Sequence, residues 1–223
     1  MTAGRGIFVT GTDTGVGKTY VAAALLRAHV ADGRRAVGMK PVAAGIDDGV
    51  PVNADVAALE AAGNVEAPLA ERNPYGFTRA VAPHLAAAAA GVTIDLATIE
   101  AAYVRLAARA DVVVVEGAGG ALVPLDDRHD MLDIALGLRL PALLVVGVRL
   151  GCISHALMTE QAVRARGLTL AGWVANVVDP AMPLVHENVA ALEKRIAAPC
   201  VATIRHGGAA AFPAQWLGGS EPC

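Results

Sequence analysis

The sequence predicts an α/β protein of three layers, with helices on both sides of a mainly parallel central sheet. Short apolar runs that fit strands alternate with alanine- and leucine-rich segments that fit helices, from residue 7 to residue 204. In addition, 55% of the 223 residues are hydrophobic and only 17% are charged, so most elements must be buried on more than one side. We expect a single domain at residues 1–223, because the sequence contains neither a linker nor an internal repeat.

The first expected strand, residues 7–9, is followed by a glycine-rich loop at residues 11–19 and then by a helix at residues 21–32. Strand, loop and helix in this order are the context that a phosphate-binding loop requires. An ordinary glycine-rich turn before a helix is the alternative. The flanking elements and the Gly-Lys-Thr sequence favour phosphate binding, and thereby a fold like that of the P-loop NTPases.

Each residue type in this loop suits a particular role in binding phosphate. Gly15 and Gly17 let backbone N–H groups turn inward around an anion, and the amino end of the helix points at the same place. Lys18 is expected to reach the outer phosphates and Thr19 to offer its hydroxyl to Mg²⁺. The usual spacing would place a glycine at Thr12, so the loop is a variant.

Lys40 is the second candidate, because lysine is rare in this chain. Only Lys18, Lys40 and Lys194 are lysines among 18 basic residues, and Lys194 fits an exposed helix face. Lys40 follows an expected strand at residues 35–39 and precedes Pro41, so it lies at the carboxyl end of that strand. Ligands bind at this edge of an open α/β sheet. A solvated lysine at a strand end is the alternative.

The next segment is expected to hold a loop at residues 41–52 and a short helix at residues 54–62, which Asn53 caps. Asp55, in the first turn of this helix, can be read from the pattern alone as a carboxylate stabilised by the helix dipole. Beyond it we expect a turn at residues 73–75 and helices at residues 85–90 and 95–109.

Glu116 carries the third strong signal. It ends the run Asp111–Glu116, whose four consecutive valines predict a strand buried on both faces, and the glycine-rich residues 117–120 follow. A carboxylate at this point is where phosphate-loop proteins hold Mg²⁺. The alternative is a charged strand terminator, but the glycines suggest close approach of a ligand to the backbone.

The remaining third of the chain continues the alternation. We expect strands at residues 141–148, 168–176 and 200–204, and helices at residues 154–166, capped by Ser154, and at residues 183–196. Asn176 ends the second of these strands. Its amide can donate and accept at a nucleotide base, although asparagine at a strand end usually makes a turn.

Composition and charge argue against several classes of protein. The formal net charge is −3 and no basic block occurs, so we expect no nucleic-acid partner. The start lacks the apolar core of a signal peptide, and no apolar run approaches membrane-spanning length, so we expect a cytoplasmic protein without membrane contact. The three cysteines are scattered and odd in number, which fits neither a disulfide framework nor a metal cluster.

Together these stretches closely resemble the dethiobiotin synthetase family. The likeness covers residues 7 to about 180 in matching order and lies in residues 11–14, 17–19, 40–42, 73–75, 116–120, 145–153 and 172–176. It implies an ATP-dependent cyclo-ligase that closes 7,8-diaminononanoate and CO₂ (or bicarbonate) into dethiobiotin. One amine takes up CO₂ as a carbamate, ATP phosphorylates the carbamate, and the second amine displaces phosphate.

The resemblance also implies roles for particular residues. Lys40, Lys18 and Thr14 would act in catalysis, and Thr19, Asp55 and Glu116 would hold Mg²⁺. The residues implied to hold ATP are Gly15, Val16, Gly17, Lys18, Thr19, Tyr20, Asp55, Glu116, Gly117, Ala118, Gly119, Asn176, Val177, Arg205, His206 and Gly207. The family is a homodimer, and residues 150–154, with Leu150 and Ser154 at their ends, would touch the substrate bound in the other subunit.

The sequence departs from the pattern of this family in three places. Ala44 stands where family members can have a serine, Ser154 replaces an asparagine, and residues 208–213 offer no match for a late nucleotide-contacting glutamate.

Two other classes of protein are alternatives. The alternative function is a partitioning-type P-loop ATPase switch, which needs a further lysine near position 13, where this chain has Asp13. A cobyrinate-type amidotransferase would need a glutaminase domain, for which 223 residues leave no room.

Overall fold

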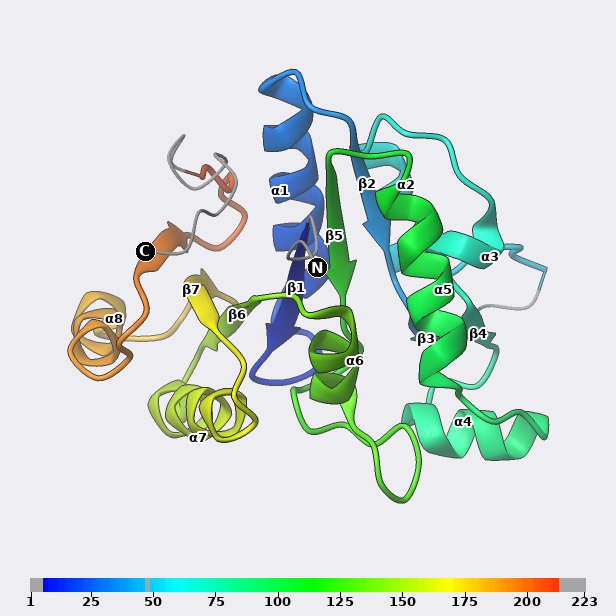
Figure 1. The fold of residues 1–223 in the computed structure, drawn as a ribbon. Helices are drawn as coiled ribbons and strands as arrows, with labels where there is room; N and C mark the ends of the chain where they lie inside the picture. Colours follow the sequence, from blue (N-terminus) through cyan, green and yellow to red (C-terminus); the bar gives the residue numbers. More distant parts are fainter. Residues whose placement is uncertain (1–5, 47–48, 213–223) are drawn as a thin grey trace.

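Runs of β-branched and other apolar residues form the strands of one parallel sheet (Figure 1). The computed structural model describes residues 6–46 and 49–212. Six strands lie in the order β2-β5-β1-β6-β7-β8, and every neighbouring pair is parallel. Their bounds are β1 Gly6–Gly11, β2 Ala36–Met39, β5 Val112–Glu116, β6 Ala142–Val148, β7 Leu170–Val177 and β8 Cys200–Ile204. The predicted fold class is confirmed, since parallel strands joined by helices form the central layer.

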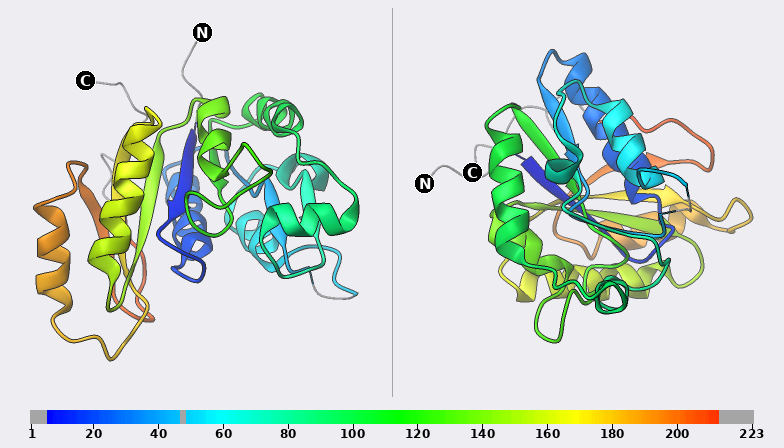
Figure 2. Two further views of the ribbon diagram at one scale, coloured as in Figure 1. Left: turned by 90° about the horizontal axis from the view of Figure 1, so that it is seen from below. Right: turned by 90° about the vertical axis from the view of Figure 1, so that its right-hand side faces the viewer.

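Helices cover both faces of this sheet, as the two views in Figure 2 show. On one face lie α1 (Lys18–Ala31) and α2 (Ala54–Ala62); on the other lie α5 (Leu96–Ala107), α6 (Met131–Leu138), α7 (Cys152–Ala165) and α8 (Val185–Glu193). All seven residues of β6 are buried, as a strand between two helix layers requires. The two short helices α3 (Leu69–Arg72) and α4 (Pro83–Ala90) lie between α2 and α5 in the chain.

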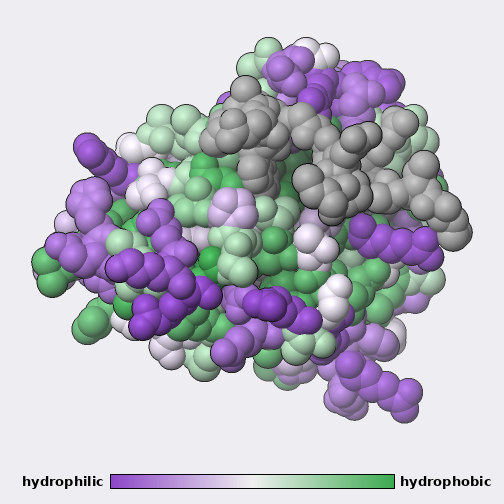
Figure 3. Space-filling view, turned by 60° about the vertical axis from the view of Figure 1, so that its left-hand side comes forward, coloured by the Kyte–Doolittle hydropathy of each residue, from purple (hydrophilic) through white to green (hydrophobic). Residues whose placement is uncertain are grey.

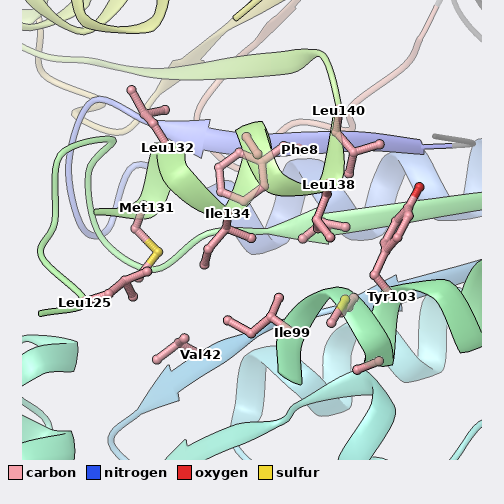
Figure 4. Packing of buried hydrophobic residues seen from close by; sticks show 14 of the residues in the cluster. Phe8, Val42, Ile99, Tyr103, Leu125, Met131, Leu132, Ile134, Leu138 and Leu140 are labelled. Carbon is pink, nitrogen blue, oxygen red and sulfur yellow. The ribbon is translucent and has the colours of Figure 1, made fainter. Parts of the chain in front are cut away.

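The core on the second face is built from side chains of β1, α5 and α6 (Figure 4). Phe8 from β1 lies among Ile99 of α5 and Ile134 and Leu138 of α6, and all four are at most 6% exposed. Because alternate residues of β1 point to opposite faces, Phe8 packs on this side while Ile7 and Val9 pack against α1. The strand that carries the glycine-rich loop is therefore fixed from both faces.

A second, two-stranded parallel sheet corrects two predictions. β3 (Val42–Ala44) lies in the segment predicted as a loop, and β4 (Tyr75–Phe77) begins in the predicted turn at residues 73–75. Strands of three residues are too short to show an alternating pattern. Asn73 is buried and its amide donates to the backbone oxygens of Lys40 and Tyr75 at 2.7 and 3.0 Å, which joins this small sheet to the end of β2.

The helix starts also differ from the predictions. Ser154 does not cap α7, because that helix begins at Cys152 and its N-cap is Gly151, with φ of 93°. A glycine readily adopts this left-handed conformation, whereas the sequence pattern drew attention to the serine. α6 was not predicted, although Asp130 and Asp133 form a reciprocal capping box at its start.

The described surface is mixed in polarity. The side of the molecule that carries α8 carries hydrophilic residues with smaller hydrophobic areas between them (Figure 3). Among the described residues, no helix is both long enough and apolar enough to cross a membrane.

Candidate active site

The glycine-rich loop lies between the carboxyl end of β1 and the amino end of α1. Gly15 and Gly17 have φ of 74° and 91°, values that other residues rarely adopt. Gly17 is required for a second reason: a Cβ there would lie 2.2 Å from the side-chain nitrogen of Asn176. That same nitrogen donates to the backbone oxygen of Val16 at 2.8 Å, so the end of β7 holds the loop in place.

Thr12, which replaces the usual glycine, is accommodated by the neighbouring strand. Its backbone N–H donates to the oxygen of Val145 at 3.0 Å, and its hydroxyl accepts from the N–H of Gly147 at 3.4 Å. Gly147 also lets the loop approach closely, because a Cβ at this position would lie 2.7 Å from Val16. The variant spacing is thus matched by contacts to β6.

Lys18 lies buried at the start of α1 and reaches back across the loop. Its ammonium group donates to the backbone oxygen of Asp13 at 2.9 Å. Burial lowers the pKa of Lys18 to about 8, and the positive charge of Lys40 acts in the same direction, although Glu116 opposes both. Lys18 and Lys40 line the same cavity, so both can face one anionic ligand.

Lys40 is the most highly connected side chain of the site. Its ammonium group lies 2.6 Å from Glu116 Oε1 and 2.8 Å from Asp55 Oδ2, and it also donates to the oxygen of Gly117 at 3.3 Å. Burial acts to lower the pKa of Lys40, but the charges of Glu116 and Asp55 outweigh it and raise this pKa above its ordinary value. The same ion pair lowers the pKa of Asp55 despite its burial. Lys40 is thus held as a cation.

The carboxylates beside Lys40 fit the requirements of Mg²⁺. Glu116 is fully buried, its Oε1 accepts from the Thr19 hydroxyl at 2.8 Å, and its Oε2 has no hydrogen-bond partner within the described residues. A buried oxygen without a partner is costly unless something fills its place. No group of three or more His, Cys, Asp or Glu side chains that could hold a metal occurs in the described part of the chain. Two carboxylates and a hydroxyl nevertheless suit Mg²⁺, which keeps several waters and phosphate oxygens.

These side chains open on a cavity of about 670 Å³ whose lining combines polar and apolar groups. Residues of the glycine-rich loop, the lysine–carboxylate cluster and the glycines after β5 supply one part of the lining: Thr14, Gly15, Gly17, Lys18, Thr19, Lys40, Asp55, Glu116, Ala118 and Gly119. Small apolar residues supply the rest: Ala44, Val123 and the four residues from Ala80 to Pro83. No sequence signal marked these apolar residues as functional, because small side chains occur throughout an alanine-rich chain. The predicted catalytic and metal-binding residues all line this one cavity.

Other predicted nucleotide residues lie outside the lining of this cavity. Val16, Gly117, Asn176 and Val177 are buried behind the loop. Tyr20 is exposed and donates to the oxygen of Gly208 at 2.7 Å, which places the segment Arg205, His206 and Gly207 near α1. These three residues are exposed.

The parallel sheet, the glycine-rich loop and the lysine–carboxylate cluster at the carboxyl ends of its strands define a P-loop nucleotide-binding protein. Comparison with known proteins narrows this class. The family model described as "AAA domain" matches residues 5–208. The chain is 56% identical over 217 residues to the ATP-dependent dethiobiotin synthetase BioD of Aromatoleum aromaticum (96% of each chain). It is 54% identical over 199 residues to the protein of that name from Nitrosospira multiformis (89% of this chain, 87% of that one). The chain belongs to the ATP-dependent dethiobiotin synthetase family.

Solved structures agree on the fold. A chain of the MinC:MinD cell division protein complex of Aquifex aeolicus superposes with a TM-score of 0.56 at 16% identity, over 90% of this chain and 81% of the other. The cell division ATPase MinD of Pyrococcus furiosus superposes with a TM-score of 0.55 at 22% identity, over 91% of this chain and 83% of the other. A ParA family ATPase from Chlorobium tepidum superposes with a TM-score of 0.54 at 15% identity, over 91% of this chain and 85% of the other. At these identities the likeness shows a shared fold, whereas the synthetases match in sequence along nearly the whole chain.

Proposed function

We propose that the chain closes 7,8-diaminononanoate and CO₂ into dethiobiotin, using ATP and Mg²⁺ and releasing ADP and phosphate in the cytoplasm, where ATP is supplied. The observation that carries this proposal is the lining of the cavity. Two buried lysines, Lys18 and Lys40, line it together with the phosphate-binding loop, and small apolar side chains complete the lining. A diamine on an aliphatic chain, which must present an anionic carbamate to ATP, matches this combination of cationic and apolar groups.

The proposed reaction assigns the bonds as follows. An amine of the substrate attacks CO₂ and loses a proton, which leaves a carbamate anion. A carbamate oxygen attacks the γ-phosphorus of ATP, and the bond between that phosphorus and ADP breaks. The second amine then attacks the carbonyl carbon of the mixed anhydride, loses a proton and expels phosphate, which closes the ureido ring. Negative charge is present at every stage, so fixed cations are the main requirement.

The polar residues that line the cavity divide this task. Lys18 and the N–H groups of Gly15 and Gly17 would hold the phosphates, as in other phosphate-binding loops. Lys40 would hold the carbamate, with the Thr14 side chain beside it. Thr19, Asp55 and Glu116 would hold Mg²⁺, which when bound offsets the charge of the β- and γ-phosphates. Because Lys40 now contacts both carboxylates, its ammonium group must share or leave these contacts as the site fills.

We assign the nucleotide to the loop and to the segments beyond it. The phosphates would lie against residues 15–20, with residues 117–119 closing the opposite side. The base would lie near Asn176 and Val177, bounded by residues 205–207. Asn176 already donates one hydrogen bond to the loop, so its oxygen and its second N–H would be left to contact the base.

The partitioning-type ATPase is not favoured. The relatives at 54–56% identity are synthetases, and the MinD and ParA structures match at only 15–22%. In addition, the loop carries the carboxylate of Asp13 at the position where that class needs a lysine, and Arg149 pairs with it at 2.6 Å.

Phosphate release provides the test of the proposed function. We expect release from ATP to require 7,8-diaminononanoate and bicarbonate together, with one phosphate per dethiobiotin formed. Omission of either substrate should reduce the rate to background. Release that continues unchanged without the diamine would identify an ATPase and contradict the proposal.

We also propose that the active species is a homodimer. Leu150, at the carboxyl end of the sheet, is 93% exposed, and Met158 on the neighbouring helix α7 is 57% exposed. An interface at this part of the molecule would cover the side chain of Leu150, which is otherwise left almost entirely in solvent. By resemblance, residues 150–154 would touch the substrate in the other subunit.

We therefore expect sedimentation under assay conditions to give the mass of two chains. Replacing Leu150 with aspartate should shift the protein to monomer and reduce turnover by roughly tenfold or more, because a charge buried in an interface without a partner is costly. Thermal unfolding checks that the monomer is folded. A wild-type monomer with full activity would contradict the dimer.

A further inference from the structure

The acidic residue in the glycine-rich loop has contacts that link it to both the loop backbone and the next strand. One carboxylate oxygen of Asp13 accepts from the N–H of Thr14 at 2.7 Å. The other lies 2.6 Å from the guanidinium of Arg149, which follows the carboxyl end of β6. The backbone oxygen of Asp13 accepts from the ammonium group of Lys18. Asp13 therefore connects Arg149 to the lysine that is expected to hold phosphate.

The carboxylate of Asp13 presents an electrostatic problem that Arg149 can solve. A negative charge in a loop that binds polyphosphate opposes the ligand, unless it is neutralised and held in one direction. Arg149 does both, because its contact fixes the second oxygen of Asp13 while the first is fixed by Thr14. The paired side chains are 42% and 49% exposed, so this ion pair contributes little to folding, about 0–1 kcal/mol. Its removal should leave the fold intact.

We propose that Arg149 is a positioning residue for ATP binding, which acts through Asp13. It holds the Asp13 carboxylate away from the phosphates and thereby fixes the backbone oxygen to which Lys18 is bonded. Without Arg149 the carboxylate is free to turn toward the phosphate site, and Lys18 loses a fixed anchor. The proposal rests on the proposed use of ATP but not on ring closure.

Equilibrium binding of Mg·ATP to Arg149→Gln tests the proposal. We expect the Kd for ATP to rise at least about fivefold, which corresponds to about 1 kcal/mol. Arg149→Lys keeps the charge and should restore the Kd to within about twofold of the wild-type value. Turnover at saturating ATP should change by less than about twofold, so that the effect appears in the KM for ATP rather than in kcat.

The decisive arm repeats Arg149→Gln in an Asp13→Asn background. Asparagine keeps an oxygen for the Thr14 N–H but removes the negative charge, so the same change at Arg149 should now alter the Kd by less than about twofold. The matched control is Arg164→Gln near the carboxyl end of α7, which removes a more exposed arginine that is also paired with a carboxylate, Glu160. It should leave the Kd unchanged, and thermal unfolding should show all variants folded.

Two results would overturn the proposal. If Arg149→Gln binds ATP as tightly as the wild type, Arg149 has no positioning role. If the loss of affinity is the same in both backgrounds, Arg149 acts on the nucleotide directly and not through Asp13. Failure of the ring-closing assay with normal ATP binding in the wild type would instead contradict the proposed function alone.

Discussion

Replacing Lys40 with glutamine is expected to slow ring closure at least about a hundredfold, or about 3 kcal/mol of transition-state stabilisation, while the Kd for Mg·ATP changes by less than about threefold. A carbamate forms reversibly and is poorly held without a fixed positive charge beside it. Lys40 provides that charge before the substrate arrives, because Glu116 and Asp55 hold it as a cation. Lys18 cannot replace it, since the phosphates of ATP claim its charge.

The ion pairs of Lys40 require a control for folding. Removing one partner of a buried pair typically costs about 3–5 kcal/mol, because the other charge is left without compensation. Glutamine can still donate one hydrogen bond to Glu116, and Mg²⁺ would offset the two carboxylates. We therefore expect Lys40→Gln to be less stable to unfolding than the wild type without Mg²⁺ and closer to it with Mg²⁺.

ATP binding and single-turnover product formation should be measured on the same preparation of Lys40→Gln. Lys194→Gln is the matched control, because Lys194 is an exposed lysine outside the cavity and its replacement should leave both quantities unchanged. Lost ATP binding with intact chemistry would make Lys40 a nucleotide residue and would contradict its assignment to the carbamate.

Replacing Glu116 with glutamine is expected to raise the Mg²⁺ concentration needed for half-maximal turnover at least about tenfold, and to lower turnover at limiting Mg²⁺ by about a hundredfold. An amide is a weaker ligand for a hard cation than a carboxylate. Glutamine keeps an oxygen for the Thr19 hydroxyl, and the exchange removes one of the two carboxylates paired with Lys40. The site should lose metal affinity more than the chain loses stability.

Glu71→Gln separates metal binding from folding. Glu71 is also buried and ion-paired, with Arg105 and Arg109, but it does not line the cavity. We expect its replacement to lower the temperature of unfolding without changing the dependence on Mg²⁺. Near-normal turnover of Glu116→Gln at limiting Mg²⁺ would show that the metal assignment is wrong.

Much of the fold could be predicted because the sequence repeats one physical pattern. Four valines in succession gave β5, and the bounds of α2 and β8 agree with those predicted. Asn53 caps α2 as expected, through the N–H of Asp55 at 2.9 Å. One rule predicted that three of the site residues lie close together, because the carboxyl ends of parallel strands meet at the same edge of a sheet. These residues are Lys18, Lys40 and Glu116.

The features that could not be predicted from the sequence depend on tertiary contacts. β3 and β4 pair with each other across more than thirty residues of chain, and each is too short for a periodic signal. The ion pair between Asp13 and Arg149 joins residues 136 positions apart, and no local pattern marks it. The hydrogen bond from the Asn176 amide nitrogen to the loop was not predicted either, because it depends on the packing of β7 against residues 16–17.

The most direct test of the proposed reaction is to follow oxygen from CO₂ into phosphate. If the carbamate is phosphorylated and the second amine then attacks its carbonyl carbon, the C–O bond breaks and the bridging oxygen leaves with phosphorus. With CO₂ labelled in both oxygens with ¹⁸O, under conditions that limit exchange with water, each released phosphate should carry one ¹⁸O and the ureido group of dethiobiotin should carry the other. Unlabelled phosphate formed alongside labelled dethiobiotin would show that ATP is hydrolysed by water, and would contradict a phosphorylated carbamate at this site.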